Sequence, residues 1–180
     1  MTKDYLILAH PRSGTGYMAN LFKLNWIDVG HEVMGEHGTS NWQFAVKADS
    51  YPYDVDGIRR QDVEFRNVIH VVRKPFDAIM SIAFTEGRSE AFRAQYIPIV
   101  GNYLERAVLS YYGWNMLIKS QQPDITCKLE NAQSVLEFAN ASPIINTREH
   151  STLFEEDFLN SISEETKWYY NKLNEWYSSL

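Results

Sequence analysis

Disulfide chemistry and membrane insertion find little support in this sequence, which has one cysteine and no long hydrophobic run. Because the single thiol of Cys127 cannot form an internal disulfide, we expect a reducing compartment and a cytoplasmic protein. Residues 5–9 are apolar, but this stretch is far too short for a signal-peptide core or a membrane span. We therefore expect no membrane partner.

An excess of positive charge is also lacking, with 17 Lys and Arg against 23 Asp and Glu and a net charge of −6. This acidic balance disfavours nucleic acid as a partner. The metal-binding patterns CxxC and HExxH do not occur, so we predict no metal. The 180 residues contain no repeat, linker or low-complexity segment and are enough for one core, which predicts a single domain over residues 1–180.

The start of the chain combines an apolar strand, a loop of small residues and a helix. We expect the strand over residues 5–9 and the helix over residues 16–25, with a loop rich in glycine and hydroxyl groups between them. Backbone N–H groups and the dipole at a helix N-terminus favour an anion. Glycines allow close approach, and hydroxyl and guanidinium groups add donors. The segment therefore predicts a phosphate-binding loop.

This loop reads PRSGTGY from Pro11 to Tyr17, and it is neither a Walker A loop nor a GxGxxG fingerprint. It resembles the 5′-phosphosulfate loop of sulfotransferases that use 3′-phosphoadenosine 5′-phosphosulfate (PAPS), commonly P-[KR]-S-G-T-[TS]-[WYL]. The resemblance implies that Arg12 stabilises the leaving 5′-phosphate. Six residues would contact the co-substrate, namely Arg12, Ser13, Gly14, Thr15, Gly16 and Tyr17. Gly16 departs from the family, since many members carry a second threonine or serine there.

A second motif strengthens this resemblance. Residues 68–72 form an apolar run typical of a central parallel strand, and a helix is expected over residues 76–86. Arg73 ends the strand, and Ser81 lies eight residues further along the chain. The pattern R-x-P-x-D-x-x-x-S resembles the 3′-phosphate signature of the same sulfotransferases. It implies that Arg73 and Ser81 hold the 3′-phosphate, a role that suits a guanidinium fork and a hydroxyl.

The alternation of strands and helices predicts a parallel sheet with helices on both faces. The resemblance implies more closely a three-layer α/β fold of the P-loop NTPase-like sulfotransferase type. Beyond the two motifs we expect helices over residues 101–121, 132–140 and 164–178 and a strand over residues 125–129. The segment ending at Arg148 resembles a family loop that closes over the nucleotide, which implies a second cation near the 3′-phosphate.

Three residues compete for the role of the base that takes the acceptor proton. Glu32 lies about as far from Arg12 as the catalytic glutamate of tyrosylprotein sulfotransferases lies from its loop. His31 is the alternative, because histidine titrates near neutral pH. Asp49 falls where cytosolic sulfotransferases, in a K-T-H-x-P stretch, carry their histidine base. The sequence leaves these alternatives open.

The resemblance implies an enzyme that transfers a sulfuryl group from PAPS to a hydroxyl of a small-molecule or carbohydrate acceptor. From position alone, five residues are expected to line the acceptor side: Glu36, His37, Trp42, Tyr51 and Tyr53. A catalytically inactive module that binds 3′-phosphoadenosine nucleotides is the main alternative. A P-loop kinase is a weaker one, because the Walker lysine–serine pair and an obvious Mg²⁺-binding aspartate are missing.

Overall fold

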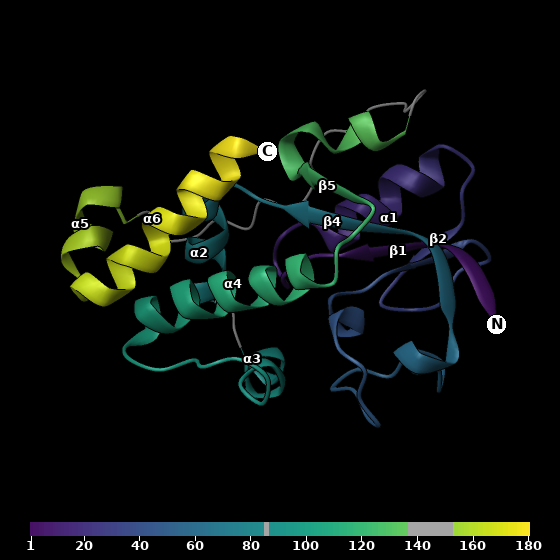
Figure 1. The fold of residues 1–180 in the computed structure, drawn as a ribbon, viewed down its shortest axis with the longest axis horizontal. Helices are drawn as coiled ribbons and strands as arrows, with labels where there is room; N and C mark the ends of the chain where they lie inside the picture. The colour runs from purple at the N-terminus through teal and green to yellow at the C-terminus, as the bar shows by residue number, and fades with distance from the viewer. Residues whose placement is uncertain (85–86, 137–152) are drawn as a thin grey trace.

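The computed structural model describes residues 1–84, 87–136 and 153–180 and shows an α/β fold around a parallel five-stranded sheet. In spatial order the strands are β2 (Val29–His31), β3 (Gly38–Ser40), β1 (Thr2–Leu8), β4 (Glu64–Val72) and β5 (Ile125–Lys128). Helices pack against this sheet (Figure 1). The predicted parallel sheet flanked by helices is confirmed.

The two central strands, β1 and β4, are longer than predicted. Their register pairs Thr2 with Glu64 and Leu8 with His70, so β1 runs beside β4 over the whole length of β1. The first residues of each strand are polar and only partly buried. The apolar pattern therefore located only the buried, C-terminal part of each strand, because polar residues are poor indicators of a strand.

The sheet is buried on both faces by alternate residues of the same strands. On one face, Ile7 and Ile69 pack against α1 (Thr15–Leu24). On the other face, Leu6 and Leu8 belong to a cluster with Trp114 of α4 (Tyr103–Ser120). Apolar residues at every position of a strand are what a doubly covered parallel sheet requires.

Helix α4 (Tyr103–Ser120) is capped at its start by a reciprocal pair of hydrogen bonds. The side chain of Asn102 accepts from the N–H groups of Leu104 and Glu105, and the Glu105 carboxylate accepts from the N–H of Asn102. This capping box explains why the helix begins there. The predicted helix over residues 101–121 is confirmed to within two residues at each end.

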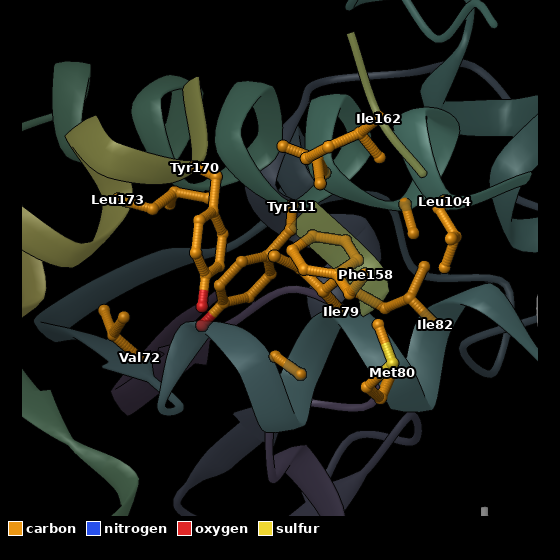
Figure 2. Close-up of a cluster of buried hydrophobic side chains, with 13 residues drawn as sticks. Val72, Ile79, Met80, Ile82, Leu104, Tyr111, Phe158, Ile162, Tyr170 and Leu173 are labelled. Atoms are coloured by element: carbon orange, nitrogen blue, oxygen red, sulfur yellow. The ribbon is translucent and has the colours of Figure 1, made fainter. Parts of the chain in front are cut away.

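A third cluster of buried side chains joins α4 to the helices α2 (Pro75–Ala83), α5 (Glu155–Asn160) and α6 (Glu164–Ser179). Figure 2 shows Tyr111 and Tyr170 inside this cluster, with Ile79 and Phe158 beside them. Tyr111 and Trp114, both on α4, are fully buried, whereas Trp168 on α6 keeps 53% of its surface exposed.

Strand β3 was not predicted, because its three residues are glycine, threonine and serine. Gly38 has φ 147°, and a β-carbon there would lie 1.9 Å from the carbonyl oxygen of Tyr5. Only glycine allows the two strands to approach at this point. Thr39 and Ser40 are fully buried although polar. Hydrophobic periodicity therefore gives no signal for this strand.

Most of the remaining differences between the predicted and the observed elements concern short helices. The structure adds α3 (Arg88–Arg93) and two 3₁₀ helices, η1 (Trp42–Ala45) and η2 (Arg60–Asp62). The predicted α-helix over residues 132–140 is wrong where the structure describes it. Residues 132–135 belong instead to the 3₁₀ helix η3 (Leu129–Val135), in which Asn131 departs from helical geometry. In the described part of the chain, no helix combines the length and apolar character needed to cross a bilayer.

Candidate functional site

The loop between β1 and α1 has a strongly curved backbone. Arg12 and Gly14 both adopt left-handed conformations, with φ 70° and 100°. The N–H of Ser13 donates to the carbonyl of His10 at 3.0 Å and closes the turn. A β-carbon on Gly14 would lie 2.3 Å from Cδ1 of Leu129, so both conformation and space favour glycine. Gly14 caps α1 without a side-chain hydrogen bond, which leaves N–H groups of the first turn for an anion.

The two predicted phosphate motifs meet in space. Nε of Arg12 donates to Oγ of Ser81 at 3.4 Å, and Nη1 of Arg73 donates to the carbonyl of Arg12 at 3.1 Å. Arg12 follows β1, Arg73 follows β4, and these strands are adjacent and parallel. The carboxyl ends of adjacent parallel strands lie at one edge of the sheet, so the loop and the strand-end arginine form one cationic cluster.

The backbone of Arg73 is held in place by Tyr111. The Tyr111 hydroxyl accepts from the N–H of Arg73 at 3.1 Å and donates to its carbonyl at 2.6 Å. Burial raises the pKa of Tyr111, so the phenol stays protonated and can keep donating. Figure 2 shows the Tyr111 side chain reaching from the buried cluster with its hydroxyl at the tip. This role could not be predicted from the sequence, because a tyrosine among the apolar residues of a helix looks like any other core residue.

A buried polar network supports the other side of the loop. Arg93 and Ser110 are fully buried, and Nε of Arg93 donates to Oγ of Ser110 at 3.0 Å. The Ser110 hydroxyl bonds to Nε2 of His10 at 2.9 Å, while Nδ1 of His10 bonds to the carbonyl of Pro11 at 2.5 Å. Burial and then the charge of Arg93 hold the pKa of His10 well below its usual range. Neutral His10 therefore donates from Nδ1 to the loop and accepts from Ser110 at Nε2.

A small cavity opens beside the loop between β1 and α1, and we call it the loop pocket. Its volume is about 200 Å³. Its lining consists of Pro11, Arg12, Thr15, His31, Glu32, Trp42, Tyr53 and Ser89. The structure thus brings the loop arginine and two of the three candidate bases to one cavity.

Both of these candidate bases are tied to the walls of the loop pocket. Oε1 of Glu32 accepts from the indole Nε1 of Trp42 at 2.9 Å. Nε2 of His31 lies 3.2 Å from the hydroxyl oxygen of Thr15, the first residue of α1. A β-carbon on Gly16 would lie 3.4 Å from Cε1 of the same histidine, which is an ordinary contact distance. There is therefore room for a β-carbon at Gly16, and what the loop lacks at this position is the hydroxyl group.

Other predicted residues lie elsewhere. Asp49 and Tyr51 line a separate, larger cavity. Glu36 and His37 precede β3, where the His37 carbonyl accepts from the N–H groups of Asp4 and Tyr5. That position is the N-terminal edge of the sheet, opposite the loop, so the prediction that Glu36 and His37 line the acceptor side is wrong.

Tyr17 and Arg148 were both predicted to contact the co-substrate. The Tyr17 ring packs in the core cluster beneath α1. Arg148 lies outside the residues that the structure describes. Within the described ranges, no three or more His, Cys, Asp and Glu side chains gather as they would around a metal ion.

No family model, no curated protein and no solved structure matches this chain.

Proposed function

We propose that this chain is a sulfotransferase that moves a sulfuryl group from PAPS to a hydroxyl of a small-molecule or glycan acceptor. The observation that carries the proposal is the contact between Arg12 and Ser81 at 3.4 Å. The two residues belong to separate segments, each of which resembles one phosphate signature of PAPS-dependent sulfotransferases. Their meeting at the carboxyl edge of a parallel sheet is what a single nucleotide with two phosphate positions requires.

The residues present fit such a nucleotide. The start of α1 supplies uncapped N–H groups, and Arg12 adds a positive charge, which suits the 5′-phosphosulfate. Arg73 has five N–H donors, one of which bonds to the Arg12 carbonyl, so its guanidinium can still grip a phosphate. The hydroxyl of Ser81 lies next to these two arginines and accepts a hydrogen bond from Arg12. This donor set supports assigning the 3′-phosphate to Arg73 and Ser81.

In sulfuryl transfer the acceptor oxygen bonds to sulfur as the bond from sulfur to the 5′-phosphate oxygen breaks. The leaving phosphate keeps the electron pair, and the acceptor proton goes to a base. Arg12 stabilises the charge that develops on the phosphate. We assign the base to Glu32, because the Trp42 indole orients one of its oxygens and leaves the other for the proton. His31, bonded to the Thr15 hydroxyl, is the alternative in the same pocket.

The test is incubation of the protein with PAPS carrying labelled sulfur, in the presence of EDTA, with panels of phenols and oligosaccharides. The proposal predicts that label appears in an acceptor and that 3′-phosphoadenosine 5′-phosphate is released. In a parallel incubation with ATP and Mg²⁺ and without EDTA, release of ADP, together with no labelled product from PAPS, would support the kinase alternative. Tight binding of 3′-phosphoadenosine 5′-phosphate without transfer to any acceptor would support the inactive binding module.

A further inference from the structure

A larger cavity lies beside α3, and we call it the α3 groove. Its volume is about 840 Å³, within the range of cavities that hold drug-sized ligands. The side chains that determine its chemistry are Lys47, Asp49, Tyr51, Arg88, Phe92 and Tyr96. None of these six takes part in the phosphate-binding cluster described above.

The α3 groove adjoins the loop pocket through a wall of aromatic rings. Trp42 lines the loop pocket, and its ring centroid lies 5.9 Å from that of Phe92, which lines the groove. Two chain segments also continue from one cavity into the other. Pro52 lines the groove and the next residue, Tyr53, lines the loop pocket; Arg88 and Ser89 are divided in the same way. A ligand in the groove can therefore extend one end toward Glu32 and Arg12.

The aromatic side chains of the groove form a continuous surface. The Phe92 ring lies 5.9 Å from that of Tyr51 and 5.3 Å from that of Tyr96, both tilted against it. The Tyr51 hydroxyl donates to the carbonyl of Val46 at 3.0 Å and accepts from the N–H of Arg60 at 3.2 Å, which fixes its ring. Tyr96 keeps 39% of its surface exposed. These rings give a ligand a rigid apolar face to stack on.

Hydrogen-bond donors and acceptors both surround these rings. Lys47 and Arg88 are donors, Asp49 is an acceptor, and the amide of Gln95 is both. The lining mixes charges of both signs, so a polyanion would meet the carboxylate of Asp49 as well as the two cations. A flat aromatic acceptor would cover the rings but would leave these charged groups without new partners. Sugar rings have an apolar face and hydroxyls that both donate and accept, so they match both parts of the lining.

We propose that the α3 groove binds an uncharged oligosaccharide and presents one of its hydroxyls to the loop pocket. This inference rests on the proposed sulfotransferase function for the fate of that hydroxyl, but the binding of sugar can be measured without turnover. It narrows the acceptor from any small molecule or glycan to a neutral carbohydrate of more than one ring.

The test is binding of the labelled full-length protein to an array of neutral, carboxylated and sulfated oligosaccharides and aryl alcohols, with and without 3′-phosphoadenosine 5′-phosphate. We expect binding to neutral oligosaccharides. Replacing Tyr96 by alanine should weaken it about tenfold or more through loss of the stacking surface. The matched control is Tyr103→Ala, because Tyr103 is also an exposed tyrosine, on α4, and it lines neither cavity. Tyr96 also packs on Trp114, so its removal affects the core as well as the groove. A second variant, Arg88→Gln, therefore tests the groove separately, and Arg66→Gln is its control.

The outcomes separate the two proposals. Neutral-sugar binding that is lost in Tyr96→Ala and Arg88→Gln, but kept in both controls, supports the inference even where the nucleotide does not bind. Nucleotide binding combined with selection of only charged glycans or aryl alcohols, or of no compound, overturns the inference and leaves the phosphate site intact. Sugar binding that is equal in all four variants also overturns it, because the sugar then lies outside the groove.

Discussion

Nε of Arg12 lies 3.4 Å from Oγ of Ser81, although 69 positions of sequence separate the two residues. The contact joins the loop after β1 to helix α2, which follows β4, and it lies next to the bond between Arg73 and the Arg12 carbonyl. Two segments that were separately predicted from the sequence to bind phosphate thus occupy one location. The proposed function depends on this convergence.

Removing the guanidinium of Arg73 should weaken nucleotide binding without unfolding the protein. We expect Arg73→Ala to cost about 1.5–3 kcal/mol, or roughly 10- to 150-fold, in affinity for 3′-phosphoadenosine 5′-phosphate, as for a hydrogen bond to a charged group. Isothermal titration calorimetry measures this. The control is Arg66→Ala, since Arg66 is an exposed arginine of β4 paired only with Asp4 among the described residues. Equal affinities for both variants would refute the 3′-phosphate assignment.

The three candidate bases can be separated by kinetics. Glu32→Gln keeps the shape of the side chain but removes the proton acceptor, so we expect kcat to fall about 10²- to 10⁴-fold with little change in nucleotide affinity. Asp49→Asn should act on the KM for the acceptor, because Asp49 lines the α3 groove. The measurement is steady-state transfer of labelled sulfur to an acceptor. A larger loss of kcat in His31→Gln than in Glu32→Gln would transfer the role of base to His31.

The buried network behind the loop should couple folding stability to ligand affinity. Ser110→Ala leaves Nε of Arg93 and Nε2 of His10 without the hydroxyl that joins them. We expect the free energy of unfolding to drop by about 1–3 kcal/mol, the usual cost of leaving a buried polar group unsatisfied. Denaturant unfolding measures this loss. We also expect weaker binding of 3′-phosphoadenosine 5′-phosphate, whereas a purely structural role would lower stability alone.

Acid should destabilise the fold through its buried histidines. Burial lowers the pKa of His70 from 6.5 to about 4, and its Nε2 donates to Oδ1 of Asn115 at 2.9 Å. Below pH 6.5 the unfolded chain binds a proton that the folded chain does not, so stability falls as the pH drops from 6.5 to about 4. The loss from His70 is about 3 kcal/mol at pH 4. His10, whose pKa is also lowered, acts in the same direction.

Denaturant unfolding at a series of pH values tests this prediction. The matched variant is His70→Gln, which retains an amide donor for Asn115 but does not titrate. Its unfolding free energy should depend less steeply on pH than that of the wild type between pH 6.5 and 4. Identical pH dependence in the two proteins would contradict the assignment of this loss to His70.

The parts of the fold that the sequence predicted well are those where local pattern and burial agree. Strands β1 and β4 have apolar C-terminal halves, and α2 begins at Pro75 with its fixed backbone geometry. Strand β3 was missed because its burial is achieved by glycine, threonine and serine. Helix α3 was missed as well, although its residue Ser89 lines the loop pocket and its residue Phe92 lines the α3 groove.

The candidate site was predictable to the extent that its residues lie in contiguous motifs. Arg12 and Ser81 could be placed together because each belongs to a recognisable pattern. The supports of the loop could not, since Arg93 and Ser110 come from separate helices and their relationship exists only in three dimensions. The same reason explains the error at His37, which lies between the two motifs in the sequence but at the opposite edge of the sheet from the loop.

The most direct test of the central claim is a calorimetric titration with 3′-phosphoadenosine 5′-phosphate and with its isomer ADP, which differs only in where the second phosphate is attached. The account predicts tight binding of the first, much weaker binding of ADP, and loss of this preference in Arg73→Ala. Equal affinity for the two isomers in the wild-type protein would contradict the account, because Arg73 and Ser81 would then hold no 3′-phosphate.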